Sequence, residues 1–217
     1  MMSESVATMK QRRRRYRDEI IEDVLSIARK MMRSDGVAAL SFNEIARRLG
    51  MQPPSLYHYF ESKNAIYDEL FRRGFEAFGH AMAQRPGQDG TLREKLHSAM
   101  ETYMRFAQEN PDLYQLMFQR PVPEFVPSET SMAASLATLG AARAQFVETL
   151  QSTELTLGIP LDQALDLVIA FEHGLTELHL ANNPELPVGE GRFGKLIPQA
   201  VQLILDAWQG NKGNSDT

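Results

Sequence analysis

The chain has 217 residues, of which 43% are hydrophobic, and this is enough for one large or two small domains. It contains no cysteine, which excludes disulfides, thiolate nucleophiles and cysteine-bound metals. The net charge of −5 is unevenly divided: residues 1–63 hold 12 Lys and Arg against 8 Asp and Glu, whereas the remainder has a net charge of −9. A basic front end is typical of a protein that binds a polyanion. No apolar run is long enough for a membrane span or a secretory signal, so we expect a cytoplasmic protein.

Apolar residues recur at helical spacing in every long segment, and no convincing period-two alternation occurs, so we predict an all-α fold. After the basic "RRRRYR" segment, one apolar stripe ends before Gly36 and consists of Ile20, Val24, Ile27, Ala28 and Met31. Ser41 and Glu44 have the spacing of a capping box, which predicts a helix that begins at Ser41. Gly50 ends this helix, and Pro53 suits the first turn of another.

Longer helices are expected over residues 62–84, 92–109, 111–119, 129–157, 161–182 and 192–209, with breaks rich in Gly, Pro and Asn. Residues 211–217 are expected to form a disordered tail. We see no internal repeat.

Two short helices joined across Gly50, after a longer one, have the proportions of a helix-turn-helix unit. A helical wheel over the second short helix places Leu56 and Phe60 on one side and His58 on the other, with Tyr57 on the flank. The apolar side is expected to pack inward. The opposite side then presents hydroxyl, imidazole and tyrosyl groups that can reach base edges or phosphates in a major groove.

Other residues near this face extend the predicted DNA contact surface. Proline rings can touch thymine methyl groups, and Asn43 and Arg47 lie four residues apart, where they can hold the phosphate backbone. Lys63 begins the next helix, where the helix dipole disfavours a cation unless a phosphate binds there. The arginine run is either a solvated tail or an arm that reaches phosphates or the minor groove. The predicted DNA-binding residues are Ser41, Asn43, Arg47, Gln52, Pro53, Pro54, Ser55, Tyr57, His58, Tyr59 and Lys63.

The stretch "LSFNEIARRLGMQPPSLYHYFESKNAIYDELF", residues 40–71, resembles the DNA-binding motif of the TetR family of bacterial transcriptional regulators. The matching positions are Ile45, Ala46, Leu49, Gly50, Leu56, Tyr57, Tyr59, Phe60, Lys63 and Ile66. The chain departs from the family pattern at residues 52–55, where Gln-Pro-Pro-Ser replaces the usual Ser, Lys and Gly, and this puts the operator sequence in doubt.

The resemblance implies a basic arm and helix-turn-helix domain over residues 1–63, a linking helix over 62–84, and a helical body over 85–210. It further implies that this body binds a small-molecule effector and forms a homodimer through the helices 161–182 and 192–208. The apolar residues of these two helices agree with an exposed dimer face: Leu165, Val168, Ile169, Leu175, Leu196, Ile197, Val201, Leu203, Ile204 and Leu205.

The body also holds pliable and aromatic side chains that suit an effector pocket, although most such residues form core. The predicted pocket residues are Met100, Tyr103, Met104, Tyr114, Met117, Phe118, Phe146, Phe171, His173 and Glu177. His173 and Glu177 share a helix face and could ligate a metal, but no third ligand accompanies them, and a structural histidine beside Gly174 is the competing interpretation. "NPDLYQLMF" with this "HG" resembles the C-terminal domain of a TetR subgroup named for a Trp-His-Gly signature, although the tryptophan is missing here.

We therefore expect a homodimeric repressor that an effector releases from a pseudo-palindromic operator, with no catalytic residue, metal or cofactor. One alternative is an enzyme that uses the His173 and Glu177 region, although no catalytic triad, phosphate loop or dinucleotide fingerprint occurs. A second alternative is an all-α dimeric scaffold whose helix-turn-helix binds protein. The sequence does not distinguish a repressor from an activator.

Overall fold

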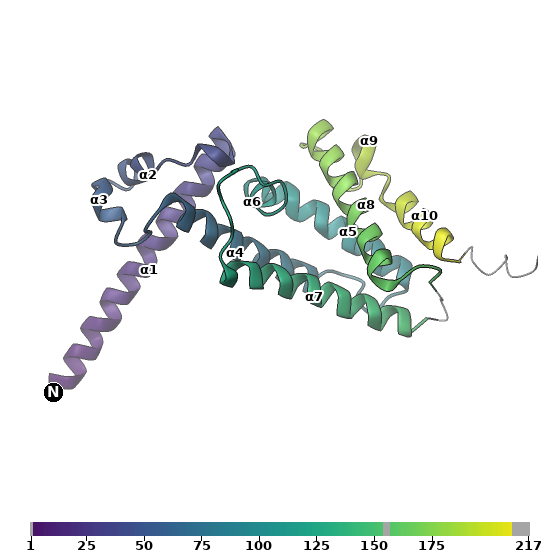
Figure 1. Ribbon diagram of the computed structural model, residues 1–217, viewed down its shortest axis with the longest axis horizontal. Coiled ribbons are helices and arrows are strands. Elements are labelled where there is room, and N and C mark those ends of the chain that lie inside the picture. The colour runs from purple at the N-terminus through teal and green to yellow at the C-terminus, as the bar shows by residue number, and fades with distance from the viewer. Residues whose placement is uncertain (1, 154–156, 210–217) are drawn as a thin grey trace, which may run out of the picture. The chain divides into compact units, whose positions relative to one another are not determined.

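The computed structural model describes residues 2–153 and 157–209, and all regular secondary structure in these ranges is helical (Figure 1). The all-α prediction is therefore confirmed. The chain divides into two compact units. Unit 1 comprises the residues up to Gly74 together with Asp112–Met132, and unit 2 comprises Phe75–Pro111 and the residues from Ala133 onward. The tail expected over residues 211–217 lies outside the described residues.

Unit 1 contains α1 (Met2–Asp35), the short helix η1 (Val37–Ala39), α2 (Phe42–Arg48), α3 (Pro53–Leu56), the first part of α4 (Lys63–Ala83) and most of α6 (Pro111–Phe118). The predicted stripe of α1 turns into the core, where Val24, Ala28 and Met31 are buried. Tyr67 of α4 is also buried, and its hydroxyl donates a hydrogen bond of 2.6 Å to the carbonyl of Val37. This bond ties α4 to the segment that leads into α2.

The arginine run differs from the expected arm, because Arg12–Arg15 belong to the continuous helix α1. Met, Arg, Lys, Glu and Ala are good helix formers, and no Gly or Pro interrupts residues 2–35. The side chains from Met9 to Glu19 are exposed. The basic segment is therefore a solvated helix rather than an extended chain.

Helix α6 is attached to α1 by an ionic cluster around one buried carboxylate. Asp112 is buried, and its carboxylate accepts hydrogen bonds from Arg29 Nε at 2.6 Å, Arg29 Nη2 at 3.1 Å and Arg33 Nε at 2.7 Å. Both arginines lie on α1, one helical turn apart. Two arginines thus satisfy one carboxylate and join segments 79 or more residues apart.

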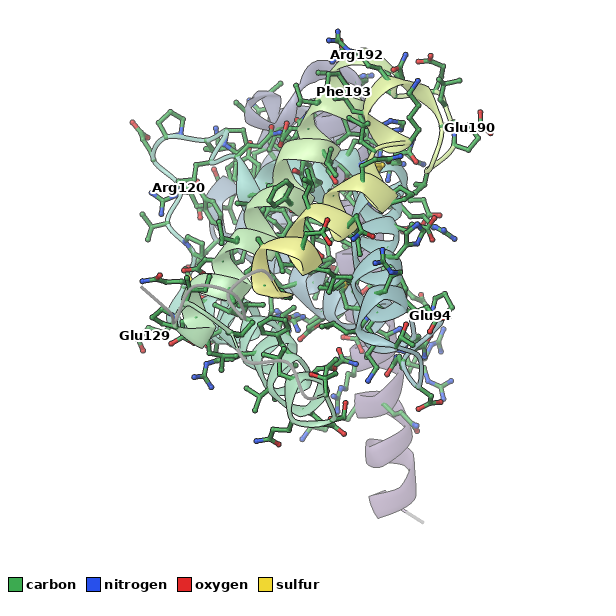
Figure 2. The ribbon with its side chains drawn as sticks, turned by 90° about the vertical axis from the view of Figure 1, so that its right-hand side faces the viewer. Glu94, Arg120, Glu129, Glu190, Arg192 and Phe193 are labelled. Carbon is green, nitrogen blue, oxygen red and sulfur yellow. The ribbon has the colours of Figure 1, made fainter. Side chains whose placement is uncertain are left out.

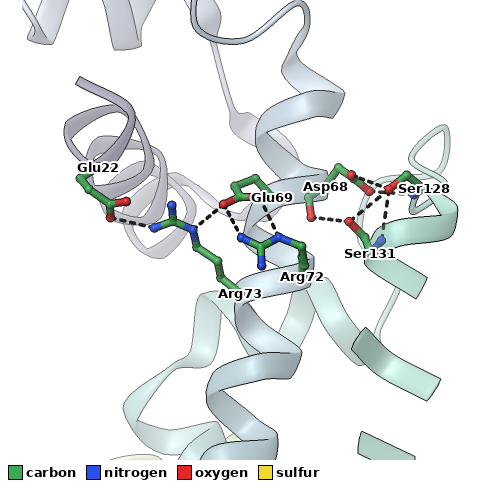
Figure 3. Close-up of polar contacts among 7 residues, drawn as sticks. All are labelled: Glu22, Asp68, Glu69, Arg72, Arg73, Ser128 and Ser131. Atoms are coloured by element: carbon green, nitrogen blue, oxygen red, sulfur yellow. Dashed lines mark hydrogen bonds and ion pairs between the residues drawn. The ribbon is translucent and has the colours of Figure 1, made fainter. Parts of the chain in front are cut away.

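A second set of polar contacts joins α1, α4 and the residues around the start of α7 within unit 1 (Figure 3). Arg73 pairs with Glu22 of α1 at 2.7 Å and with Glu69 of its own helix at 2.6 Å. Asp68 accepts hydrogen bonds from both the backbone amide and the hydroxyl of Ser128, at 2.7 and 2.8 Å. These contacts hold α4 on two sides.

Unit 2 contains the rest of α4, α5 (Leu92–Glu109), most of α7 (Glu129–Gln151), α8 (Leu161–Asn182), α9 (Gly191–Gly194) and α10 (Ile197–Gln209). A full capping box begins α5: Thr91 Oγ1 accepts from the Glu94 amide at 3.3 Å, and the Glu94 carboxylate accepts from the Thr91 amide at 2.7 Å. The core lies between α5, α7, α8 and α10 and includes Phe146 and Trp208, whose rings are 5.6 Å apart.

Two helix boundaries differ from the prediction. Helix α7 ends at Gln151 rather than near residue 157, and residues 154–156 lie outside the described chain. The helix expected over 192–209 is broken into α9 and α10. Pro198 accounts for the break, because it has no amide to bond the carbonyl of Gly194 and its ring would clash with that carbonyl in a continuous helix.

The helices α8 and α10 lie side by side in the foreground of Figure 2. The interpretation of their apolar residues as a dimer face is wrong for most of them, because they form the core of unit 2: Leu165, Val168, Ile197, Val201, Ile204 and Leu205 are buried, and Ile169 and Leu175 pack against them. A different apolar set is exposed on these helices and in the turn before α10, and it consists of Leu167, Phe171, Leu178, Leu196 and Leu203. Only Leu196 and Leu203 belong to both sets.

Candidate nucleic-acid interface

The turn between α2 and α3 is defined by caps at both ends of α2. Ser41 begins the helix, since its hydroxyl accepts from the Glu44 amide at 3.4 Å. At the other end Gly50 has φ of +64°, the Met51 amide bonds the Ala46 carbonyl at 2.9 Å, and the Gly50 amide bonds the Arg47 carbonyl at 3.1 Å. This is a Schellman motif, which sends the chain sharply away from α2 and into α3.

Helix α3 is only four residues long, but hydrogen-bonded turns continue to Phe60, whose amide bonds the Leu56 carbonyl at 3.1 Å. Leu56 exposes 0% of its surface and Phe60 7%, whereas Tyr57 exposes 57% and His58 is also exposed. The predicted orientation of this turn is therefore confirmed. The apolar pair anchors it in the core, and the opposite side faces solvent.

The Tyr57 ring does not project freely. It lies against Phe42, the first residue of α2, with ring centroids 4.7 Å apart. Aromatic pairs at this distance restrict each other's rotamers. This contact was not predicted from the sequence, and it holds the tyrosine hydroxyl in a defined direction on the outer face.

The other predicted DNA-binding residues lie on the same local framework. Five have exposed side chains: Asn43, Arg47, Gln52, Pro54 and Lys63. Four are partly exposed: Ser41, Pro53, Ser55 and Tyr59. None of the set is buried, so each has a solvent-facing part that a ligand could contact.

Glu44 behaves differently from the prediction. Its carboxylate does not return to the Ser41 amide but accepts from Arg47 Nη2 at 2.6 Å and Arg48 Nε at 2.7 Å. These hydrogen bonds lower the pKa of Glu44 to about 2, so it remains a carboxylate at neutral pH. Arg47 is thus oriented by Glu44, and a DNA phosphate would have to compete with this exposed ion pair, which is a weak interaction in water.

The start of α4 completes the face. Ser62 caps this helix, since its hydroxyl accepts from the Ala65 amide at 3.2 Å. Lys63 follows with an exposed side chain, and its Nζ lies 6.0 Å from the centre of the Tyr67 ring. The lysine therefore sits beside the first amides of the helix, where an anion would relieve its unfavourable interaction with the helix dipole.

The predicted effector residues divide between the two units. Tyr114, Met117 and Phe118 belong to α6 in unit 1. Unit 2 holds the other seven, of which Met100, Tyr103, Met104 and Phe146 are buried, His173 and Glu177 are partly exposed and Phe171 is exposed. The structure therefore does not gather the ten residues within one unit.

His173 bonds to the Tyr103 hydroxyl, with Nδ1 at 2.9 Å, and the two rings meet edge to face at 5.0 Å. Burial lowers the pKa of His173, although the nearby Glu177 opposes this shift. Within the described residues no group of three or more His, Asp or Glu could hold a metal. A neutral histidine that contacts Tyr103 fits these observations.

Two titratable residues lie on either side of His173 in the sequence: Glu172, which was not predicted as a site residue, and His179, which was counted among the ligand-suitable side chains but not among the pocket residues. Both are buried on α8. His179 Nε2 lies 3.2 Å from the Leu186 carbonyl and 3.1 Å from Gln108 Nε2, so it joins α8 to the loop before α9. Thr176, which lies between Glu172 and His179 on α8, is buried on the same face of the helix. Glu172 and His179 continue the helical spacing of the buried residues Leu165 and Val168, and this spacing could have predicted that both are buried.

Two family models match this chain. One, described as "Bacterial regulatory proteins, tetR family", matches residues 24–70, which cover the helix-turn-helix. The other, "Tetracyclin repressor-like, C-terminal domain", matches residues 96–191. The chain belongs to the TetR family of bacterial transcriptional regulators, a class of regulators rather than enzymes. The assignment to a Trp-His-Gly subgroup stays a prediction.

Individual relatives agree with this family. The chain is similar to the HTH-type transcriptional activator FasR of Mycolicibacterium smegmatis, with 28% identity over 48% of this chain and 47% of the relative. It is also similar to the uncharacterized HTH-type transcriptional regulator YobS of Bacillus subtilis, with 28% identity over 42% and 48%. The chain thus spans about half the length of these relatives.

Solved structures show the same fold at low identity. A TetR family regulator, PfmR from Thermus thermophilus, superposes with a TM-score of 0.60 at 22% identity and covers 84% of this chain and 96% of its own. A protein of unknown function from Rhodococcus sp. RHA1 reaches 0.70 at 19% identity and covers 88% and 94%. No helix among the described residues is both long and apolar enough to span a bilayer.

Proposed function

We propose that this protein is a homodimeric regulator that reads a pseudo-palindromic operator through the outer face of α3. The observation that carries the proposal is the opposite exposure of adjacent residues: Leu56 is buried while Tyr57 and His58 face solvent. A helical turn anchored in this way can enter a major groove without disturbing the core. A bacterial regulator meets its operator in the cytoplasm, which is the compartment we propose.

The contacts divide by chemistry. His58, Ser55 and Gln52 carry groups that can bond base edges, and Pro53 and Pro54 can touch thymine methyls. Tyr57, Asn43, Arg47 and Lys63 carry donors for phosphate, with Ser41 and Tyr59 at the border of the face. The exposed basic helix of residues 10–17 adds charge that strengthens binding regardless of sequence.

We place the dimer interface on the exposed apolar face of α8 and α10. Leu167, Phe171 and Leu178 lie along one side of α8, and Leu203 is exposed on α10. Gly174 belongs to the same side of α8, and a Cβ built there meets no atom of the described residues within 4 Å. A second copy could therefore bring its helix close at this glycine while the larger side chains are buried around it.

We further propose that residues 1–63 form the DNA-binding domain and 85–210 the effector-binding and dimerisation domain, with release from DNA when an effector binds. A difference of about 1.4 kcal/mol between DNA-bound and effector-bound states changes operator affinity tenfold, so a small rearrangement suffices. Repression is our first choice. Activation is the second candidate, because the similar protein FasR is named as an activator.

Selection of bound sites from random duplexes, with and without cell extract, tests the proposal. We expect a pseudo-palindromic sequence, loss of binding when residues 1–63 are removed, and a steep fall in affinity with added salt. A shallow salt dependence with no enriched sequence would instead support the scaffold that binds protein. A reporter gene placed downstream of the selected sequence separates repression from activation.

A further inference from the structure

One exposed stripe of α1 changes the sign of its charge halfway along, and we call it the mixed stripe. Its members are Arg12, Arg15, Glu19 and Glu22. They are spaced by three, four and three residues, so they lie on one side of the helix, about one turn apart. All four side chains are exposed. The first half of the mixed stripe is therefore positive and the second half negative, and both halves face solvent.

The mixed stripe has charges that its own chain leaves available. Within the described residues, no ion pair is formed by Arg12, Arg15 or Glu19. Glu22 pairs with Arg73 at 2.7 Å, but its side chain keeps 60% of its surface exposed. The surface here is a shallow hollow, whose lining residues are Arg15, Asp18, Glu19, Glu22 and Asp23. A partner can therefore approach these charges without displacing a packed side chain.

The first half of α1 also has room for a second helix beside it. Its N-terminal turns extend away from α2 and α3 (Figure 1), and the side chains of residues 9–19 are all exposed. The other side of these turns carries four basic residues and no carboxylate: Lys10, Arg13, Arg14 and Arg17. That side suits DNA phosphates, whereas the carboxylates of the mixed stripe would repel them. The two sides of the helix thus suit different partners.

Two copies of the mixed stripe are complementary when they run antiparallel. If Arg15 of one copy lies opposite Glu19 of the other, then Arg12 lies opposite Glu22, and two-fold symmetry repeats both pairs. A shift of the partner by one helical turn would instead place Arg15 opposite Arg15, or Glu19 opposite Glu19. These like charges would repel. The charge pattern therefore selects the first register.

We propose that the mixed stripe is a self-association surface, which pairs α1 with the antiparallel α1 of a second copy. A second copy fits better than an unrelated protein, because symmetry supplies the reversed charges at the matching spacing. The groove beside the negative half is lined in part by Asp18, Glu22 and Glu61, and it adds negative potential for the arriving arginines. This surface is separate from the apolar face of α8 and α10.

The association depends on salt. Exposed ion pairs are individually weak and are screened by dissolved ions, so the α1 contact forms at low ionic strength and dissolves when salt is added. Salt does not screen the burial of apolar side chains, so the contact proposed for α8 and α10 persists. One salt titration can therefore separate the two contacts.

Sedimentation velocity of the full chain, without DNA, in about 0.02 M and about 1 M sodium chloride tests the inference. We expect a larger species at low salt and only a smaller, salt-resistant species at high salt. Arg15→Glu and Glu19→Arg should each weaken the low-salt association at least about tenfold, because each places like charges opposite one another in both symmetric pairs. Arg13→Glu makes the same charge change on the other side of the helix, and this matched control should associate as the wild type does.

A mixture of the two charge-reversed variants distinguishes pairing between copies from any effect within one helix. The new glutamate of Arg15→Glu then faces the new arginine of Glu19→Arg. The unchanged Glu19 of the first protein also faces the unchanged Arg15 of the second. The equimolar mixture should therefore regain the low-salt association that each variant alone has lost. Both variants should keep the circular dichroism of the wild type, since both positions are exposed.

The same size distribution at both salt concentrations would overturn the inference. Wild-type association by both Arg15→Glu and Glu19→Arg would also overturn it, as would a mixture that stays as dissociated as its two components. Operator binding does not enter these measurements. Their failure would therefore leave the proposed function untouched, and a protein that associates in this way but binds no DNA would refute the proposed function alone.

Discussion

At the scale of single residues, one peptide bond separates a side chain of the core from a side chain of the candidate interface. Leu56 is buried and Tyr57 is mostly exposed, with its ring held against Phe42. The ring contact and the hydroxyl can be separated by mutation. The ring positions the side chain, and the hydroxyl is the group that can bond a phosphate.

We expect Tyr57→Phe to weaken binding to the selected operator about fivefold, because one hydrogen bond of roughly 1 kcal/mol is lost while the ring contact is retained. Tyr57→Ala should weaken it further, and both effects should be similar across operator sequences. His58→Ala should in addition relax the base preference. Fluorescence anisotropy on a panel of operator variants measures these changes, and wild-type affinity in all three proteins would mean that this face does not meet DNA.

We expect the Glu172 carboxyl group to make the stability of the folded protein depend on pH in a defined direction. Burial raises its pKa from 4.5 to about 7 in the folded protein, so the folded state binds more protons than the unfolded state between these values. Stability is therefore lost as pH rises through this window. Glu172→Gln should remove the loss and be more stable than wild type by roughly 3 kcal/mol at about pH 8, with little difference near pH 4.

Urea unfolding at fixed protein concentration across this pH range checks the expectation, with Asp166→Asn as control. Parallel pH profiles for the wild type and Glu172→Gln would show that the carboxyl group is solvated in the folded protein. Fixed concentration is needed because a dimer gains apparent stability with concentration.

At the scale of elements, α6 and α1 are joined by a cluster that neither helix reveals alone. Burial by itself would raise the pKa of Asp112, but hydrogen bonds from Arg29 and Arg33 outweigh it and hold the pKa below its usual value. The carboxylate therefore stabilises the fold at neutral pH. This contribution is lost as pH falls through the lowered pKa.

Asp112→Asn should destabilise the protein by about 2 kcal/mol at neutral pH, less than for a fully buried pair because both arginines remain partly exposed. The difference from wild type should shrink in acid, where wild-type Asp112 is protonated too. Urea unfolding measures it, and Asp89→Asn, at an exposed aspartate in the loop before α5, is the control. Equal denaturation midpoints for Asp112→Asn and wild type would contradict the account of this cluster.

At the scale of the whole molecule, the dimer proposal depends on apolar side chains that the described part of the monomer leaves uncovered. Leu203 exposes 60% of its surface on α10, a helix that contacts α8. The helix α7 offers a comparison, because Leu136 is equally exposed there. Exposed leucines by themselves do not identify an interface, so the two positions must be tested together.

Leu203→Glu should weaken dimerisation about 100-fold or more, because a charged group would replace an apolar side chain buried between two copies. Operator affinity should fall with it, since two half-sites are bound jointly. Leu136→Glu should leave both properties unchanged. Sedimentation velocity measures the oligomeric state, and fluorescence anisotropy measures the operator affinity. A Leu203→Glu protein that remains dimeric would show that the interface lies elsewhere.

Much of the fold was predictable because it depends on neighbours within four residues. The bounds of α5 and α8 follow from periodicity with turn residues at their ends, and the Ser41 cap and the Gly50 turn follow from side-chain chemistry. The same local pattern sufficed to predict which side of α3 is buried. The resemblance to the TetR family was also recognised from this local stretch of sequence, and the family model that matches residues 24–70 confirms it.

Tertiary structure decided what each apolar or ionic side chain meets. Val201 and Leu203 are both aliphatic residues of α10, and the packing of this helix buries Val201 but leaves Leu203 exposed. Asp112 finds both its partners on a helix about eighty residues away, which no local pattern indicates. The physical reason is that helical periodicity defines a face, whereas the free energy of burying that face depends on which distant segment covers it.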